Sequence, residues 1–260
     1  MAEYQEILCE KQGPICIIKL NRPKVLNALV PSVFTEINQV LDEIETDGVT
    51  RVVILTGEGR AFAAGADISY MKDMTCVEAK KFAADQTAIM RRMENMCIVF
   101  IAAVDGYALG GGCELTMACD LRVAEPNTKF ALPETSLGII PGFNGTQRLS
   151  RLVGKTVAME MVLTNKRIGA EEALRLGLVN CVAEEGKLMD EAIALANKIV
   201  ANGAVAIACG KEAVQRGLEM DFDSAMALET SLFGLLFGTE DQKEGMTAFM
   251  EKRKAEFKNR

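Results

Sequence analysis

Residues 98–124 read IVFIAAVDGYALGGGCELTMACDLRVA, and their pattern decides the fold class. The apolar run over residues 98–104 predicts a buried strand, and residues 121–124 predict a second one. Between them, residues 113–119 are apolar nearly all round, which predicts a buried helix. Strand, helix and strand in this order indicate an α/β protein whose strands pair in parallel.

The flanking sequence extends this pattern in both directions. Apolar periodicity predicts a hairpin of two strands before the deciding stretch, followed by helices and a further strand. The expected elements are strands at residues 4–10, 15–20 and 51–56 and helices at residues 31–45 and 77–96. Beyond residue 158 the pattern is mostly helical, with helices expected at residues 188–200, 205–217, 224–236 and 240–257. A basic cluster at residues 252–254 suits the C-terminus of the last helix.

The composition limits the chemistry that the chain can perform. The absence of His removes Ser-His and Cys-His nucleophiles and the commonest metal ligand. Acid-base chemistry near neutral pH therefore depends on carboxylates, Lys, Cys or Tyr. The eight Cys are scattered singly, which favours small buried hydrophobic residues in a reducing compartment over disulfides or metal ligands.

Charge and hydropathy indicate where the protein works. A net charge of −7 disfavours a broad nucleic-acid-binding surface. The longest apolar runs are too short to span a bilayer. The segment Met1-Ala2-Glu3-Tyr4 lacks the basic and then apolar pattern of a secretory signal. We therefore expect a cytoplasmic protein that binds neither nucleic acid nor membrane.

Three consecutive glycines, Gly110, Gly111 and Gly112, directly precede the expected buried helix. Three glycines cost backbone entropy, and they make sense where a ligand must approach main-chain N–H groups at a helix start. A tight turn from strand to helix, without any ligand, would explain them equally well.

Two glutamates in apolar surroundings are the candidate acids. Glu114 falls in the first turn of the buried helix, where desolvation would raise its pKa. Glu134 follows Pro133, which restricts Leu132 to an extended form, so we expect Glu134 on a rigid non-helical segment. Two such carboxylates could share acid and base roles. Glu114 could equally be an ordinary surface residue, a loop Glu such as Glu134 is more often solvated than catalytic, and their spacing does not prove that they meet.

The loop at residues 60–68, RAFAAGADI, is a second candidate for backbone chemistry. It follows an expected strand, is rich in small residues, and could supply a further N–H donor. The alternative is a plain connection that ends with Asp67 as the N-cap of a helix.

The order of these motifs resembles the crotonase (enoyl-CoA hydratase/isomerase) family almost end to end. The segments that carry the resemblance are residues 21–24, 27–29, 62–68, 102–115, 133–134 and 145–149. Several motifs in one order are more specific than any single one. The resemblance implies a spiral of β-β-α units over residues 1–200 and a C-terminal helical trimerisation region over residues 201–260. It also implies that trimers pair into a homo-hexamer.

The resemblance also implies roles for individual residues. The N–H groups of Ala66 and Gly111 would bind the thioester carbonyl oxygen. Glu114 would activate a water molecule and Glu134 would deliver a proton to C2. The implied CoA-binding residues are Lys24, Leu26, Ala64, Asp67, Ile68, Phe233, Phe249 and Lys252, the last three from a neighbouring subunit. No metal and no separate cofactor are implied, because CoA is part of the substrate.

The glutamate pair, 134 − 114 = 20 positions apart, favours one activity within the family. Members that only shift double bonds usually lack an acid at the first position, so the resemblance implies reversible hydration of a short-chain trans-2-enoyl-CoA such as crotonyl-CoA. An enoyl-CoA isomerase, another CoA lyase and an RNA-binding member of the family are the alternatives. Departures from the usual family text are Val25, Thr135 and Asn144.

Overall fold

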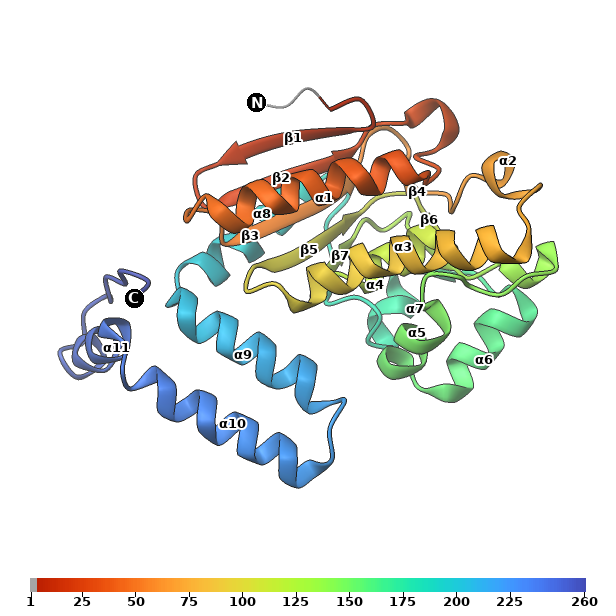
Figure 1. Ribbon diagram of the computed structural model, residues 1–260. Coiled ribbons are helices and arrows are strands. Elements are labelled where there is room, and N and C mark those ends of the chain that lie inside the picture. Colours follow the sequence, from red (N-terminus) through yellow and green to blue (C-terminus); the bar gives the residue numbers. More distant parts are fainter. Residues whose placement is uncertain (1–3) are drawn as a thin grey trace.

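A six-stranded sheet forms the centre of the computed structural model, which describes residues 4–260 (Figure 1). Its strands are, in spatial order, β1 (Ile7–Gln12), β2 (Ile15–Leu20), β3 (Val52–Gly57), β5 (Val99–Val104), β7 (Leu121–Ala124) and β10 (Cys181–Val182). The β1–β2 hairpin is antiparallel, and every other pair in the sheet is parallel. The parallel strands are buried nearly throughout, as expected for strands covered on both faces.

A second, four-stranded sheet is built from very short strands. They are, in order, β4 (Ala61–Ala63), β6 (Tyr107–Leu109), β8 (Lys129–Ala131) and β9 (Ile168–Gly169). The chain alternates between the sheets, because β3, β5 and β7 lie in the large sheet and each is followed by a strand of the small one. Helices follow these strand pairs, so the predicted spiral of β-β-α units is confirmed.

Helices cover both faces of the large sheet. One face packs against α1 (Pro31–Thr46), α3 (Cys76–Asn95), α4 (Gly111–Met117) and the small sheet. The opposite face packs against α8 (Leu188–Val200) through Leu188, Ala192 and Ala196. Figure 1 shows α1 and α8 on opposite sides of β2 and β3. Successive side chains of each strand point to opposite faces of the sheet and therefore pack into two separate hydrophobic cores.

Shorter helices complete the core. They are the 3-10 helices η1 (Pro23–Val25) and η2 (Glu134–Leu137) and the α-helices α2 (Ile68–Met71), α5 (Gly145–Val153), α6 (Lys155–Thr164) and α7 (Ala170–Arg175). In Figure 1, α5 and α6 lie together at one end of the molecule.

Three C-terminal helices lead away from the core: α9 (Ala204–Gly217), α10 (Phe222–Leu236) and α11 (Glu240–Met250) (Figure 1). Lys211 anchors α9, because its Nζ lies 2.8 Å from Asp120 Oδ2 and donates to the carbonyl oxygens of Met93 and Ile98. Among the helices of residues 4–260, no single one is long and apolar enough to cross a membrane. The α8–α9 pair reaches that length and composition only together, across a 105° bend.

Most predicted elements of the large sheet and its helices are confirmed within a few residues, but three predictions were wrong. The first strand occupies Ile7–Gln12, later than the predicted residues 4–10. The last helix ends at Met250, so the basic residues 252–254 lie beyond it rather than at its final turn. Glu134 does not lie on a non-helical segment but begins the 3-10 helix η2. Pro allows this geometry because it favours the first turn of a helix, and here it precedes η2 directly.

The small sheet was missed altogether. Its strands β4, β6 and β8 have three residues each, too short for a period of two to stand out from a loop. The eight cysteines are free thiols, with Cys16, Cys113 and Cys119 buried and Cys76 and Cys97 exposed. The prediction about a secretory signal rests on Met1, Ala2 and Glu3, which lie outside the described residues.

Candidate active site

The candidate site is a cavity of about 960 Å³ at the ends of the short strands. Its polar side is formed by the loop after β4, the start of α4 and the start of η2, which bring Glu114 and Glu134 to one pocket. Its apolar side comes from α2, α3 and the loop after η2, with Met71, Met74, Ala79, Phe82, Ala83, Leu137, Ile139, Ile140 and Phe143. The structure therefore joins two carboxylates to a mainly apolar chamber.

The glycine run at the start of α4, where Gly110 is the N-cap, is required by the close approach of neighbouring segments. Gly110 has φ +49°, and a Cβ there would lie 2.8 Å from Glu134 Oε1. A Cβ on Gly112 would overlap the carbonyl oxygen of Ala63, where α4 packs on β4. Any larger residue would push the helix start out of the pocket, so the run is more than a tight turn.

Two backbone N–H groups lie next to each other in the pocket. A Cβ on Gly111 would lie 3.3 Å from the nitrogen of Ala66, which places the two segments in contact. Within residues 4–260, neither the Ala66 nor the Gly111 N–H donates to a backbone or side-chain acceptor. Both residues line the cavity. Two unpaired donors, one in the loop after β4 and one at the start of α4, form the arrangement that stabilises a developing oxyanion.

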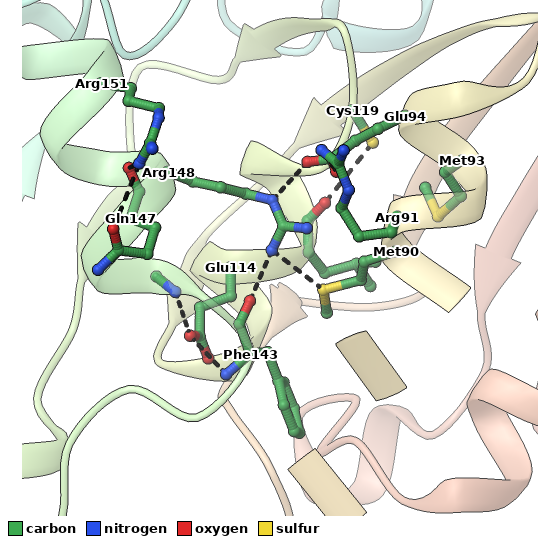
Figure 2. A network of polar contacts seen from close by, with 12 residues as sticks. Met90, Arg91, Met93, Glu94, Glu114, Cys119, Phe143, Gln147, Arg148 and Arg151 are labelled. Carbon is green, nitrogen blue, oxygen red and sulfur yellow. Dashed lines mark hydrogen bonds and ion pairs between the residues drawn. The ribbon is translucent and has the colours of Figure 1, made fainter. Parts of the chain in front are cut away.

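Glu114 is held firmly from one side (Figure 2). It is 1% exposed, and its Oε1 accepts hydrogen bonds from the N–H groups of Phe143 at 2.8 Å and Gly145 at 2.6 Å. A Cβ on Gly145 would lie only 2.7 Å from that oxygen, so the contact needs glycine. Since Oε1 is fixed by the loop, Oε2 is the oxygen left for a ligand in the cavity.

Glu134 is held less firmly. Its Oε2 is buried without a hydrogen-bond partner, and no other side chain of the described residues bonds to its carboxylate. An unpaired buried carboxylate oxygen is costly, and such groups are often functional.

Burial raises the pKa of both carboxyl groups. Desolvation is the main cause for Glu134 and raises its pKa to about 7. Desolvation also dominates for Glu114, and the negative charge of Glu134 adds to it, while the Gly145 and Phe143 N–H groups and Arg148 oppose the rise; the pKa is about 7. Acids with pKa values near neutrality can both give and take protons under ordinary conditions.

Comparison with known proteins identifies the family. The sequence profile described as enoyl-CoA hydratase/isomerase matches residues 10–260. The chain belongs to the enoyl-CoA hydratase/isomerase family. It is 51% identical to the short-chain-enoyl-CoA hydratase of Clostridium acetobutylicum over 99% of this chain and 100% of the relative. It is 46% identical to the crotonyl-CoA hydratase of Syntrophomonas wolfei over 98% of both chains. A crystal structure of an enoyl-CoA hydratase from Bacillus anthracis superposes with a TM-score of 0.94 at 38% identity, covering 98% of this chain and 100% of that one.

The residues expected to bind CoA in this family fall into two groups. In the first, Ala64 and Ile68 line the cavity, and the Leu26 carbonyl accepts from the Ala64 N–H at 2.9 Å. Lys24 is exposed on η1, the 3-10 helix that Leu26 ends. Asp67 accepts from the Ser69 N–H, so the expected N-cap of α2 is confirmed, while its role in CoA binding stays a prediction.

The second group lies on the C-terminal helices and does not reach the pocket of its own chain. Phe233 on α10 is 62% exposed and Phe249 on α11 is 82% exposed. Lys252 is exposed just beyond α11, with φ +54°. None of these three residues lines the cavity.

Several functional features escaped the sequence interpretation. The roles of Phe143, Gly145 and Arg148 around Glu114 were not predicted. One available signal was the placement of Arg148 on the face of α5 that carries Gly145, Leu149 and Leu152, where an apolar residue is expected. Among residues 4–260, no three His, Cys, Asp or Glu side chains gather as metal ligands.

Two of the three departures from the family text have structural reasons. Asn144 adopts φ +67°, the left-handed region that Asn tolerates better than other residues with side chains. The Oγ1 of Thr135 lies 2.8 Å from the carbonyl oxygen of Val162 and 2.8 Å from Asn165 Oδ1, tying η2 to the end of α6. Nothing in the structure explains Val25, which is exposed.

Proposed function

We propose that the protein reversibly hydrates short-chain trans-2-enoyl-CoA thioesters to 3-hydroxyacyl-CoA. The observation that carries this proposal is the meeting of Glu114 and Glu134 with two unpaired N–H groups in one apolar pocket. Such a site offers acid-base groups for water addition and an anion site for the enolate. The names of the two relatives, short-chain-enoyl-CoA hydratase and crotonyl-CoA hydratase, support the same reaction.

In the proposed mechanism, the thioester carbonyl oxygen accepts hydrogen bonds from Ala66 and Gly111. Glu114 takes a proton from a water molecule through its free Oε2 while the water oxygen bonds to C3. The electrons of the C2–C3 double bond move toward the carbonyl, and the N–H pair stabilises the enolate charge. Glu134 then delivers a proton to C2, so one water molecule is added across the double bond.

The apolar wall supports a short acyl group. The rings of Phe82 and Phe143 stand 5.4 Å apart edge to face, and Phe34 packs on Phe143 at 5.8 Å. Tyr70 adds a ring 5.7 Å from Phe82. Phe82 and Phe143 line the cavity, whereas Phe34 and Tyr70 pack behind them. We propose that Phe82 and Phe143 limit the length of acyl chain that the chamber accepts.

The C-terminal helices carry an apolar surface that suits subunit assembly. Large apolar side chains on α10 and α11 are exposed in the single chain, and they include Phe222, Met226, Phe233, Leu235, Phe237, Phe249 and Met250. Such a surface on a helical extension suits contacts between subunits. We propose a homo-hexamer of paired trimers in which Phe233, Phe249 and Lys252 complete a neighbour's CoA site. We also propose a cytoplasmic location, no bound cofactor, and no binding to nucleic acid or membrane.

The decisive experiment follows the loss of the enoyl thioester absorbance band with crotonyl-CoA and with longer 2-enoyl-CoA substrates. We expect rapid hydration of crotonyl-CoA and a fall in kcat/KM as the acyl chain lengthens. A parallel assay with a 3-enoyl-CoA tests the isomerase alternative. Conversion of the 3-enoyl substrate without any hydration of crotonyl-CoA would refute the proposal.

A further inference from the structure

Arg148 is a buried cation that the proposed reaction does not use. Its side chain is 9% exposed on α5, and its Nε donates to Glu94 Oε1 at 2.5 Å. Its Nη1 donates to the carbonyl oxygen of Phe143 at 2.6 Å, while Nη2 has no partner among residues 4–260. A buried ion pair with an unsatisfied donor is a poor way to gain stability, so a different reason for Arg148 is needed.

The loop at residues 142–145 connects Arg148 to Glu114 (Figure 2). The N–H groups of Phe143 and Gly145 both point to Glu114 Oε1. The peptide between them points its carbonyl the other way, to Arg148. Asn144 makes this alternation possible through its left-handed conformation. The N–H groups of the loop thus form an anion-binding nest around Glu114. Arg148 holds the loop from the side opposite Glu114, through the Phe143 carbonyl.

Glu94 fixes Arg148 in this position. Glu94 lies on α3 with 8% of its side chain exposed, and its second oxygen, Oε2, accepts from Arg91 at 2.9 Å. Arg91 in turn contacts Glu219 near the end of α9 at 3.3 Å. Because the Nε and Nη1 of Arg148 are both occupied, its guanidinium has one orientation, which Lys could not reproduce.

We propose that Arg148 is a positioning residue for Glu114, holding the loop at residues 142–145 so that one carboxylate oxygen is fixed and the other faces the substrate water. Glu94 holds Arg148 in turn. The inference rests on the proposed hydration and goes beyond it, because it assigns the geometry of the base to two residues outside the pocket.

The charges predict a specific pH signature. The charged or titratable groups that face Glu114 are Glu134 from η2, the neighbouring Cys113 thiol and Arg148 from α5. Those that face Arg148 are Glu94 and, behind it, Arg91. Loss of the Arg148 charge raises the pKa of Glu114, because that cation stabilises the carboxylate. Loss of the Glu94 charge lowers the pKa of Glu114, because the Arg148 cation is then no longer neutralised.

The test compares Arg148→Met and Glu94→Gln with the control Arg151→Met, which removes an exposed cation of the same helix. For Arg148→Met we expect kcat to fall about tenfold with KM within about twofold. The acid limb of its kcat/KM profile should move up by about 0.5 to 1 pH unit. For Glu94→Gln the acid limb should move down. Arg151→Met should match the wild type.

Opposite shifts in the two variants would show that the charge of Arg148 reaches Glu114, and the fall in kcat at nearly unchanged KM in Arg148→Met would support the positioning role. A wild-type profile with kcat within twofold for Arg148→Met would overturn it. If Arg148→Met does not fold, the double variant Glu94→Met, Arg148→Met is used instead. It removes both buried charges together, a change that proteins often tolerate. Wild-type kcat in that double variant would equally overturn the proposal.

An activity-independent measurement separates this inference from the proposed function. The carboxyl band of Glu114 can be titrated by infrared difference spectroscopy, with Glu114→Gln to assign it. We expect the midpoint to rise in Arg148→Met and to fall in Glu94→Gln even if crotonyl-CoA is not the substrate. Unchanged midpoints in both variants would refute the inference and leave the hydratase assignment untouched.

Discussion

Burial raises the pKa of both glutamates in the pocket by a similar amount, but the contacts that hold the two carboxylates differ. Glu114 stands on the buried helix α4, and two backbone N–H groups hold one of its oxygens. Glu134 begins the short 3-10 helix η2 and has a buried oxygen that hydrogen-bonds to no atom of the described residues. Burial raises the pKa of both to about 7. At Glu134 only its own backbone N–H opposes the rise, whereas at Glu114 two N–H groups of a distant loop and the Arg148 cation oppose it.

This difference suggests a division of work. A carboxylate with one fixed oxygen aims the other at a defined point, which suits the activation of a single water molecule. A carboxyl group that no other residue holds can turn between a bound water and C2 of the substrate, which suits proton delivery. In the proposed mechanism Glu114 is thus the rigid acid and Glu134 the adjustable one, and each can be perturbed separately.

The largest expected effect comes from removing either acid. Glu134→Gln should lower the kcat for crotonyl-CoA by at least about a hundredfold, because a general acid-base group is lost. Glu114→Gln should cause a similar loss, and the double variant should be little worse than either single one, because the pair acts as a unit. Steady-state assays of the three variants provide the measurement. A double variant far slower than both singles would show that the carboxylates do not share one water.

A smaller fall in kcat is expected when Glu114 is kept but the backbone contacts that hold its carboxylate are disturbed. Gly145→Ala places a Cβ 2.7 Å from Glu114 Oε1 and should displace that carboxylate, lowering kcat about tenfold or more. The matched control is Gly210→Ala on α9, where no heavy atom lies within 4 Å of an added Cβ. The control should keep full activity. Equal activity in both variants would mean that the rigid seating of Glu114 is unimportant.

Stability should reveal the cost of burying Glu134. Its folded pKa of about 7 lies above the ordinary value of 4.5. The folded state therefore holds this proton through the range in which the unfolded chain releases it, so stability falls as pH rises from 4.5 to 7. Glu134→Gln lacks this loss, so its Tm should match the wild type near pH 4.5 and exceed it by about 2 °C or more at pH 8. A Tm difference that does not grow with pH would contradict the buried, unpaired carboxyl.

The smallest effect is expected at the anchor of η2. Thr135→Val removes the hydroxyl that ties η2 to α6 and should cost about 1 kcal/mol in urea unfolding. It should lower kcat less than tenfold, because only the adjustable acid is affected. Thr135→Ser keeps the hydroxyl and is the control. A shift in the infrared titration of Glu114 in Thr135→Val would show that the two supports are not independent.

Sequence patterns predicted the large sheet well and the small sheet not at all. Strands such as β5 and helices such as α8 are long and apolar on the faces that pack, so the hydrophobic pattern of the sequence predicts them. Strands β4, β6 and β8 exist only because each pairs with a neighbour far away in the chain. At the site, residue chemistry indicated Glu114 and Glu134 as candidates, and the family resemblance suggested that they meet.

The sequence by itself determined that carboxylates must carry any acid-base chemistry, because His is absent, and that glycines precede a buried helix. It also determined the family, through motifs in a fixed order. Only the tertiary structure decided how each acid is supported. Glu114 meets Gly145 from 31 positions away, and Arg148 meets Glu94 from 54 positions away. Such contacts depend on how loops close across the core, which local periodicity does not encode.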